Sequence, residues 1–126
     1  MDTPRPTDAE YEILRALWER GPSTVREVYD AITRVKDVGY TTVLKQMQVM
    51  HSKGLLTRSE RFRSHVYEPA QKQAQVRRQL AGAMLQQAFG GSALELLQSA
   101  LAGRKVTAEE LADIRELLSR YDGGKK

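Results

Sequence analysis

Three Thr-x-x-Glu segments, Thr7–Glu10, Thr24–Glu27 and Thr107–Glu110, each precede apolar residues at helical spacing. In such a capping box the threonine hydroxyl accepts a hydrogen bond from a backbone N–H, and the glutamate side chain reaches back to the threonine N–H. Each box therefore marks the start of a helix. Together they predict a chain that is helical near both of its ends.

Two helices are expected in the first third of the chain. The first box begins a helix over residues 8–20, which Gly21-Pro22 ends. The second box begins a helix that ends before a polar connection, residues 35–40, whose glycine suits a turn. The apolar stripes of these helices are Tyr11, Leu14, Leu17 and Trp18, and then Val25, Val28, Tyr29 and Ile32.

A third helix is expected over about residues 41–53. Val43, Met47 and Met50 recur at i, i+4 and i+7 and should face the core, with Leu44 beside them. Gly54 is placed to cap the helix in the left-handed conformation. The opposite, largely polar face consists of Thr42, Lys45, Gln46, Val49 and Lys53.

After Gly54 the hydrophobic pattern changes from helical to alternating. Leu56, Arg58 and Glu60 alternate with Leu55, Thr57 and Ser59, which is typical of a strand. Residues 65–69 are expected to form the returning strand, which ends at Pro69. The two segments predict a short hairpin. Its tip, Arg-Phe-Arg-Ser at 61–64, should present two arginines around Phe62.

From Ala70 the pattern is helical again, with breaks at Gly90-Gly91 and Gly103 and a cap at Ser92. Residues 70–126 are too few to close a generous core alone, so their apolar faces should pack against a second copy of the chain. We expect a first domain over residues 7–69, a helical dimerisation region over 70–121, and flexible tails at 1–6 and 122–126. The expected dimerisation residues are Val76, Leu80, Met84, Leu85, Phe89, Leu94, Leu97, Leu101, Leu111, Ile114, Leu118 and Tyr121.

Charge is unevenly distributed along the chain, whose formal net charge is +4. Residues 1–33 carry four arginines and seven acidic side chains, whereas residues 34–69 carry seven basic and three acidic side chains. The basic block coincides with the third helix and the hairpin. Such a block is expected on a surface that faces phosphates.

Several function classes find no support in the sequence. It has no cysteine, and its histidines, His51 and His65, lie on different elements without an evident third ligand, so no metal site is expected. No phosphate-binding loop, dinucleotide-binding glycine pattern or nucleophile elbow occurs. No apolar run approaches the roughly 18 residues of a membrane span, and the N-terminus lacks a signal-peptide core. We therefore expect a cytoplasmic protein with no catalytic residues and no cofactor.

Three helices followed by a hairpin describe a winged helix-turn-helix, whose third helix enters the major groove of DNA. Thr41 and Thr42 can contact phosphate oxygens or the methyl group of thymine. Gln46 can form hydrogen bonds with adenine, and Lys45 can reach guanine or a phosphate. The flanking backbone or minor groove would be held by the hairpin arginines Arg58, Arg61 and Arg63. Two alternatives stay open: a winged helix used for protein contacts, and a repressor that holds a small molecule between its domains.

The chain resembles the penicillinase-repressor family (BlaI/MecI/CopY type) over about residues 7–121. The segments that carry the resemblance are TDAEYEILRALWERGPSTVREVYDAI, YTTVLKQMQVMHSKGLL, RSHVYEP, FGGSALELLQSAL and TAEELADIRELL. The family's Tyr-Thr-Thr opening matches residues 40–42, and its Lys-Gly-Leu-Leu closing matches residues 53–56. The resemblance implies a transcriptional repressor that is mainly α-helical with a β-hairpin wing. It also implies a homodimer that binds a palindromic operator in double-stranded DNA.

The sequence departs from the family pattern at some positions. Many members carry Asn-Arg where this chain has Gln48 and Val49, so the groove-facing edge is partly apolar and the operator can differ. The copper-responsive branch carries C-terminal cysteines that this chain lacks, which excludes copper sensing by that chemistry. The full set of expected DNA-binding residues is Tyr40, Thr41, Thr42, Lys45, Gln46, Gln48, Val49, Lys53, Arg58, Arg61, Arg63 and His65.

The resemblance also implies a route of release from DNA. Release in family members is coupled to a membrane metalloprotease sensor, often one that detects β-lactams, which would connect the chain to antibiotic resistance. Members can be cut at an Asn-Phe bond in the middle helix of the dimerisation region. That bond aligns approximately with Ser99-Ala100, whose side chains differ from Asn and Phe in size and polarity. Because glycines flank that short helix, we expect inactivation between Ser92 and Lys105.

Overall fold

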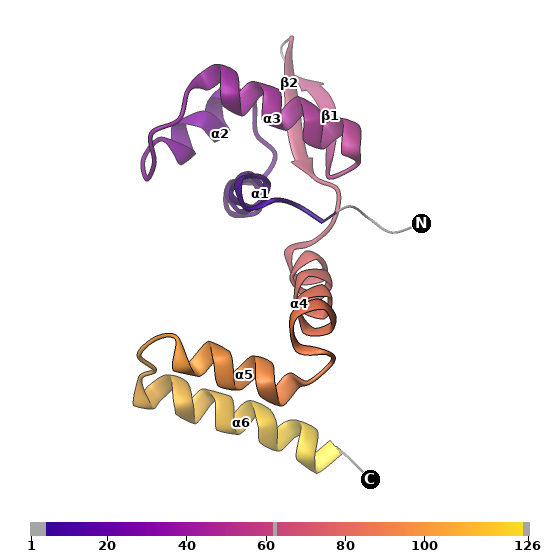
Figure 1. Ribbon diagram of the computed structural model, residues 1–126. Helices are drawn as coiled ribbons and strands as arrows, with labels where there is room; N and C mark the ends of the chain where they lie inside the picture. Colours follow the sequence, from indigo (N-terminus) through magenta and orange to yellow (C-terminus); the bar gives the residue numbers. More distant parts are fainter. Residues whose placement is uncertain (1–4, 62, 125–126) are drawn as a thin grey trace. The chain divides into compact units, whose positions relative to one another are not determined.

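The structure of the chain is a computed structural model that describes residues 5–61 and 63–124. Within these residues the chain forms six helices and one two-stranded antiparallel sheet (Figure 1). Contacts divide it into two compact units, with the boundary between Ala81 and Gly82. The mainly α-helical class with a β-hairpin, expected from the sequence, is confirmed.

Helices α1 (Asp8–Arg20) and α2 (Val25–Ile32) begin at the first two capping boxes, as predicted. Thr7 Oγ1 accepts the N–H of Glu10 at 3.2 Å, and Glu10 Oε1 accepts the N–H of Thr7 at 3.0 Å. The box of α2 has the same reciprocal pair of bonds. At the end of α1, Gly21 adopts a φ of 91°, which favours glycine and explains the stop.

Helix α1 lies at the centre of the N-terminal unit, since α2, α3 and β2 all pack on it. Ile13, Leu14 and Leu17 are 0–1% exposed. The predicted stripe included Leu14 and Leu17 but not Ile13, and it included Trp18, which is only half-buried. The buried face of α1 is wider than one stripe because it meets several elements.

Helix α3 (Tyr40–Lys53) starts one residue before the predicted position and ends where predicted. Gly54 caps it with φ 87° and ψ 10°, and its N–H donates to the carbonyl oxygens of Met50 and His51. The expected left-handed cap is therefore confirmed.

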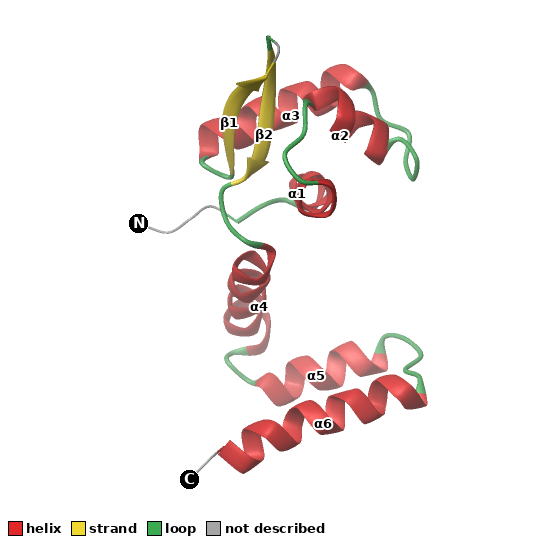
Figure 2. Cartoon of the chain, turned by 180° about the vertical axis from the view of Figure 1, so that it is seen from behind, coloured by secondary structure: helices red, strands yellow, loops and turns green. Residues whose placement is uncertain are grey.

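Strands β1 (Leu56–Arg61) and β2 (Ser64–Pro69) form the predicted hairpin, visible from behind in Figure 2. They pair from Leu56 opposite Pro69 to Arg61 opposite Ser64. Phe62, predicted as an exposed aromatic at the tip, lies outside the described residues. Ser23, in the α1–α2 connection, exchanges two backbone hydrogen bonds with Tyr67, at 3.0 and 2.8 Å. This bridge fixes the base of the hairpin to the helices.

Helix α4 (Gln73–Phe89) starts in the N-terminal unit and crosses the boundary after Ala81. Val76 in its first turns is 4% exposed. The indole Nε1 of Trp18 donates to the carbonyl oxygen of Gln71 at 3.1 Å, just before the helix begins. The start of α4 is thus held by α1.

The second unit contains the end of α4, together with α5 (Ala93–Ala102) and α6 (Ala108–Gly124), which lie side by side in both views (Figures 1 and 2). Ser92 caps α5 as predicted, accepting the N–H of Glu95. Thr107 likewise accepts the N–H of Glu110 at 3.0 Å, while the Glu110 carboxylate lies 2.6 Å from Arg104 Nη2.

Part of the tail that was expected over residues 122–126 is helical. Helix α6 continues to Gly124, and the last two residues lie outside the described part of the chain. A glycine in a helix costs only about 1 kcal/mol relative to alanine, so Gly123 alone does not stop the helix.

The second unit has no core of its own in the part that the structure describes, since no residue from 82 to 122 is buried. None of the described helices is both long enough and apolar enough to cross a membrane.

Glu10 joins the start of α1 to the end of α3. Its Oε2 lies 2.7 Å from Nζ of Lys53, and its side chain is 9% exposed. Burial by itself raises the pKa of this carboxyl, but hydrogen bonds from Lys53 and Thr7 outweigh burial and hold the pKa below its usual 4.5. The folded state therefore favours the ionised form. This stabilisation is present above about pH 4.5 and is lost as the pH falls through the lowered pKa.

We predict that Glu10→Gln lowers the free energy of unfolding by about 1–2 kcal/mol near neutral pH, because the amide has no charge to pair with Lys53. The difference from wild type should shrink at an acidic pH below the lowered pKa, where the wild-type carboxyl is protonated too. Urea unfolding at the two pH values measures both effects. An equal loss at both would contradict the role of the charge.

Glu19→Gln is the matched control for this change. The Glu19 side chain is 72% exposed and lies 3.9 Å from Arg15. Exposed pairs of this kind contribute about 0–1 kcal/mol, so the control should leave stability nearly unchanged at either pH.

Candidate nucleic-acid interface

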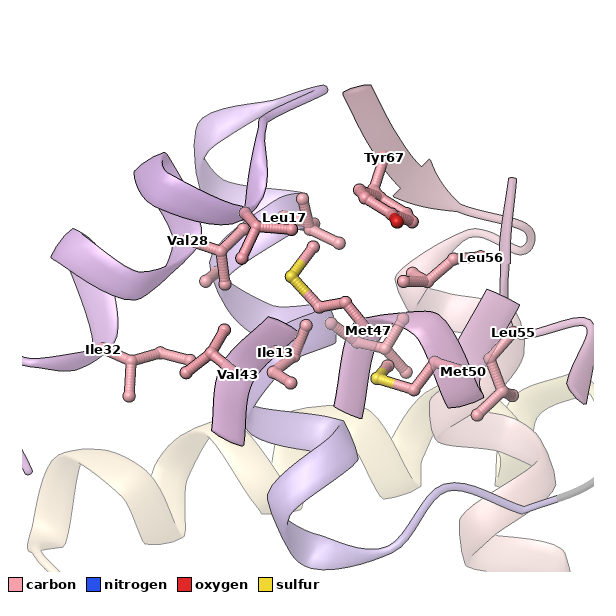
Figure 3. Packing of buried hydrophobic residues seen from close by; sticks show 13 residues of the cluster. Ile13, Leu17, Val28, Ile32, Val43, Met47, Met50, Leu55, Leu56 and Tyr67 are labelled. Carbon is pink, nitrogen blue, oxygen red and sulfur yellow. The ribbon is translucent and has the colours of Figure 1, made fainter. Parts of the chain in front are cut away.

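Three buried side chains fix the rotation of α3 about its own axis. Val43, Met47 and Met50 are 0–1% exposed and point into the core beside Ile13 and Leu17 of α1 (Figure 3). Because residues three and four apart share one face of a helix, the opposite side of α3 points away from the core. The side chains exposed on that side are Thr41, Thr42, Lys45, Gln48, Val49 and Ser52.

A cluster of two tyrosines and an arginine joins the start of α2 to the start of α3. The rings of Tyr29 and Tyr40 meet edge to face, with their centres 5.5 Å apart. The Arg26 guanidinium carbon lies 4.9 Å from the centre of the Tyr40 ring and 5.7 Å from that of Tyr29. Gly39, the N-cap of α3, provides no side-chain hydrogen bond. The first turn of α3 is therefore held by the packing of Tyr40.

Arg26 was not among the predicted DNA-binding residues, although the structure places it beside the outward side of α3. The sequence feature that could have indicated Arg26 is its position two residues after the Thr24 cap, in the first turn of α2. Arg26 lines a hollow of about 220 Å³ together with Gln48 of α3 and His65 of β2. The imidazole of His65 also lies 3.8 Å from the carboxylate of Glu60. This hollow brings together three of the predicted DNA-binding residues, Tyr40, Gln48 and His65.

The three hairpin arginines have three different settings. Arg58 and Arg61 are three residues apart in β1, so they project from opposite faces of the sheet. Arg61 Nη2 lies 3.8 Å from the carboxylate of Glu27 in α2. Arg63 stands at the tip with a left-handed φ of 66°. The hairpin therefore carries all three arginines, but not on one face.

The edge of α3 that is nearest α1 is less open than its outward side. Gln46 is half-buried, and Lys53, with its side chain 34% exposed, is paired with Glu10. Part of the positive charge predicted for DNA contact is thus already matched within the protein. A second hollow, of about 320 Å³, lies along this edge; it is lined by Thr7, Glu10, Thr42, Lys45, Gln46 and Val49.

The outward side of α3 offers hydroxyl, amide and ammonium groups on one projecting helix. A helix of this kind fits the major groove of DNA, which is about 12 Å wide. Arg26 and the hairpin lie to the side, where backbone phosphates would pass. No group of three or more His, Asp or Glu side chains that could hold a metal ion occurs in the described residues.

The predicted dimerisation residues differ widely in exposure. Val76 is buried by its own chain, which leaves it little surface to offer a second subunit. Leu117, which was not predicted, is 45% exposed, although its position three residues after Ile114 could have indicated it. The half-buried members are Leu80, Leu85, Phe89, Leu97, Leu101, Leu111 and Ile114. The exposed members are Met84, Leu94, Leu118 and Tyr121.

Known transcriptional regulators are similar to this chain over most of its length. The family model described as penicillinase repressor matches residues 6–120. The transcriptional regulator BlaI of Mycobacterium tuberculosis is 31% identical over 120 residues, which cover 93% of this chain and 85% of that protein. The penicillinase repressor of Bacillus licheniformis is 20% identical over 123 residues, covering 98% of this chain and 96% of that one.

A solved structure supports the fold. The solution structure of the monomeric form of Bacillus licheniformis BlaI, in complex with the blaP half-operator, has a TM-score of 0.51 at 22% identity. The similarity covers 58% of this chain and 89% of that chain. The winged-helix architecture expected from the sequence is thereby confirmed.

These names are those of transcriptional regulators rather than of enzymes, which confirms the expectation that the chain has no catalytic function. Because the family model spans nearly the whole chain and the mycobacterial regulator is similar over most of its length, the chain belongs to the penicillinase repressor family of transcriptional repressors.

Proposed function

We propose that this repressor binds double-stranded DNA by inserting the outward side of α3 into the major groove of a palindromic operator. The observation that carries the proposal is the set of exposed polar groups on α3, including Thr41, Lys45 and Gln48. Arg26 of α2 and His65 of the hairpin line one hollow together with Gln48. The solution structure with a similar fold is described as a complex with a half-operator, which supports the proposal.

The charge of this surface also favours DNA. Residues 34–69 carry seven basic and three acidic side chains. Glu10 and Glu27, which lie close to this surface, are each paired with a cation, Lys53 and Arg61 respectively, so neither stands as an unmatched negative charge. Contacts between the basic side chains of this surface and phosphates would release counterions and make binding steeply dependent on salt.

We assign different tasks to α3 and to the hairpin. Gln48 is exposed on the outward side, whereas Gln46 lies on the half-buried edge, so Gln48 is better placed to pair with the edge of an adenine. Arg63 at the hairpin tip and Arg26 beside α3 are placed for phosphates, which fix position without reading sequence.

We further propose that the second unit forms a homodimer. None of its described residues is buried, although α5 and α6 carry regularly spaced leucines. Met84, Leu94, Leu118 and Tyr121 are 52–72% exposed. A partner copy would cover these side chains, and its two-fold symmetry would require inverted half-sites in the operator.

The route of release is also part of the proposal. Helix α5 has ten residues, none of them buried, and lies between Gly90-Gly91 and Gly103. Local opening of such a helix should cost little free energy, which suits cleavage by a protease. A cut there would separate α6 from the DNA-binding unit, and a monomer loses the gain from tethering two half-sites. A membrane metalloprotease sensor as partner rests on the family resemblance, and a cytoplasmic location remains the expectation from the sequence.

The division of roles can be tested with two variants. Gln48→Ala should weaken operator binding by about 1–3 kcal/mol and relax discrimination at one base pair. Arg63→Asn tolerates the left-handed backbone and should weaken operator and random DNA alike, lowering the slope of affinity against salt by about one. Fluorescence anisotropy on both duplexes at several salt concentrations measures this. Identical behaviour of the two variants on both duplexes would show that the assigned roles are wrong.

The dimer can be tested with a charge in its proposed interface. Leu118→Glu should convert the dimer to a monomer in sedimentation experiments at micromolar concentration, because burying an unpaired carboxylate is costly. The helix content should persist, since Leu118 is 52% exposed in the single chain. Val35→Glu, at an 82% exposed position between α2 and α3, is the control and should leave the dimer intact. A wild-type chain that sediments as a monomer would reject the homodimer.

Cleavage can be tested by mass spectrometry of the repressor recovered from cells before and after induction. We expect fragments whose new ends lie between Ser92 and Lys105, only after induction. Fragments that end elsewhere, or an intact chain that leaves DNA, would reject proteolysis at α5 and favour release by a small ligand.

A further inference from the structure

We propose that Val49 contacts the 5-methyl group of a thymine and so sets a preference for T·A at one base pair of each half-site. The inference rests on the proposed function, in which α3 enters the major groove. It assigns a specificity-determining role to an apolar residue on an otherwise polar surface.

Val49 is set apart from the other large apolar side chains of α3. It is 42% exposed, whereas Val43, Met47 and Met50 are 0–1% exposed in the core. Tyr40, the other exposed apolar side chain of α3, already packs against Tyr29. The methyl groups of Val49 therefore remain on the outward side of the helix, where the single unit does not cover them.

The surroundings of Val49 suit the floor of a DNA groove. Val49 lines the 320 Å³ hollow together with Lys45 and Thr42, which lie one and two turns before it on α3. Glu10 also lines the hollow, but its carboxylate is held by Lys53 at 2.7 Å and by the N–H of Thr7 at 3.0 Å. The hollow thus combines the apolar surface of Val49 with Lys45, whose ammonium group has no ion-pair partner among the described residues, while the Glu10 carboxylate is already paired.

The chemistry of the major groove selects the partner of such a surface. Thymine presents a 5-methyl group there, whereas cytosine carries only hydrogen at the same carbon and presents an amino donor beside it. Valine can cover the methyl group but cannot accept a hydrogen bond from the amino group. Removing one methyl group from water is worth about a fourfold change in affinity.

The test uses the full-length repressor and a duplex selected by it from random DNA. Each thymine of that duplex is replaced in turn by deoxyuridine, which lacks only the methyl group. We expect wild-type binding to weaken about fourfold at one position of each half-site. Val49→Ala should bind the thymine and deoxyuridine duplexes equally at that position. Alanine has a higher helix propensity than valine, so the variant should fold.

Val35→Ala is the matched control, because Val35 is an exposed valine outside the helices. It should retain the full wild-type response to deoxyuridine. A wild-type chain that is insensitive to deoxyuridine at every position would overturn the proposal, and so would a Val49→Ala variant that keeps the response. In both cases DNA binding itself would stand. Failure to enrich any sequence would instead reject the proposed function together with this inference.

Discussion

The packing of α3 against α1 determines what the rest of the surface can do. Val43, Met47 and Met50 form one side of α3 and are sealed against Ile13 and Leu17. A rotation of α3 by a single residue, about 100°, would bring polar side chains into the core and would cost several kcal/mol. The direction of Lys45 and Gln48 is therefore fixed by side chains on the far side of the same helix, well before any DNA is bound.

Much of the fold follows from short-range signals and could be predicted. The boxes at Thr7 and Thr24 and the left-handed cap at Gly54 each depend on a few neighbouring residues, so the sequence contains the whole cause. The burial of Ile13 could not be predicted in this way. It depends on α2, α3 and β2 meeting α1 from several directions, which no periodicity within α1 reveals.

The candidate interface, too, could be predicted from the sequence only in part. The face of α3 that bears Lys45 could be predicted because helical spacing determines it. The difference between Gln46 and Gln48 could not, since it depends on how close α1 lies to each edge of α3. Arg26 was missed for a related reason: its place beside α3 depends on how Tyr29 and Tyr40 join α2 to α3.

The acidic residues at the edge of the interface show how the same side chains serve folding and binding. Glu10 and Glu27 each complete a capping box, and each also contacts a cation that could otherwise meet phosphate, Lys53 and Arg61. The pKa of Glu27 is held below its usual value, chiefly by the backbone hydrogen bond from Thr24, with a further contribution from Arg61 against the opposing effect of burial.

Both carboxylates therefore stay ionised at neutral pH and offset part of the basic block. The number of lysines and arginines in that block overstates the number of phosphates that the surface can neutralise. In the proposed complex with DNA, a larger share of the affinity would then come from contacts to base edges, which depend on sequence and only weakly on salt. That balance would favour discrimination between operator and random DNA, and it would follow from helix caps that the chain needs in order to fold.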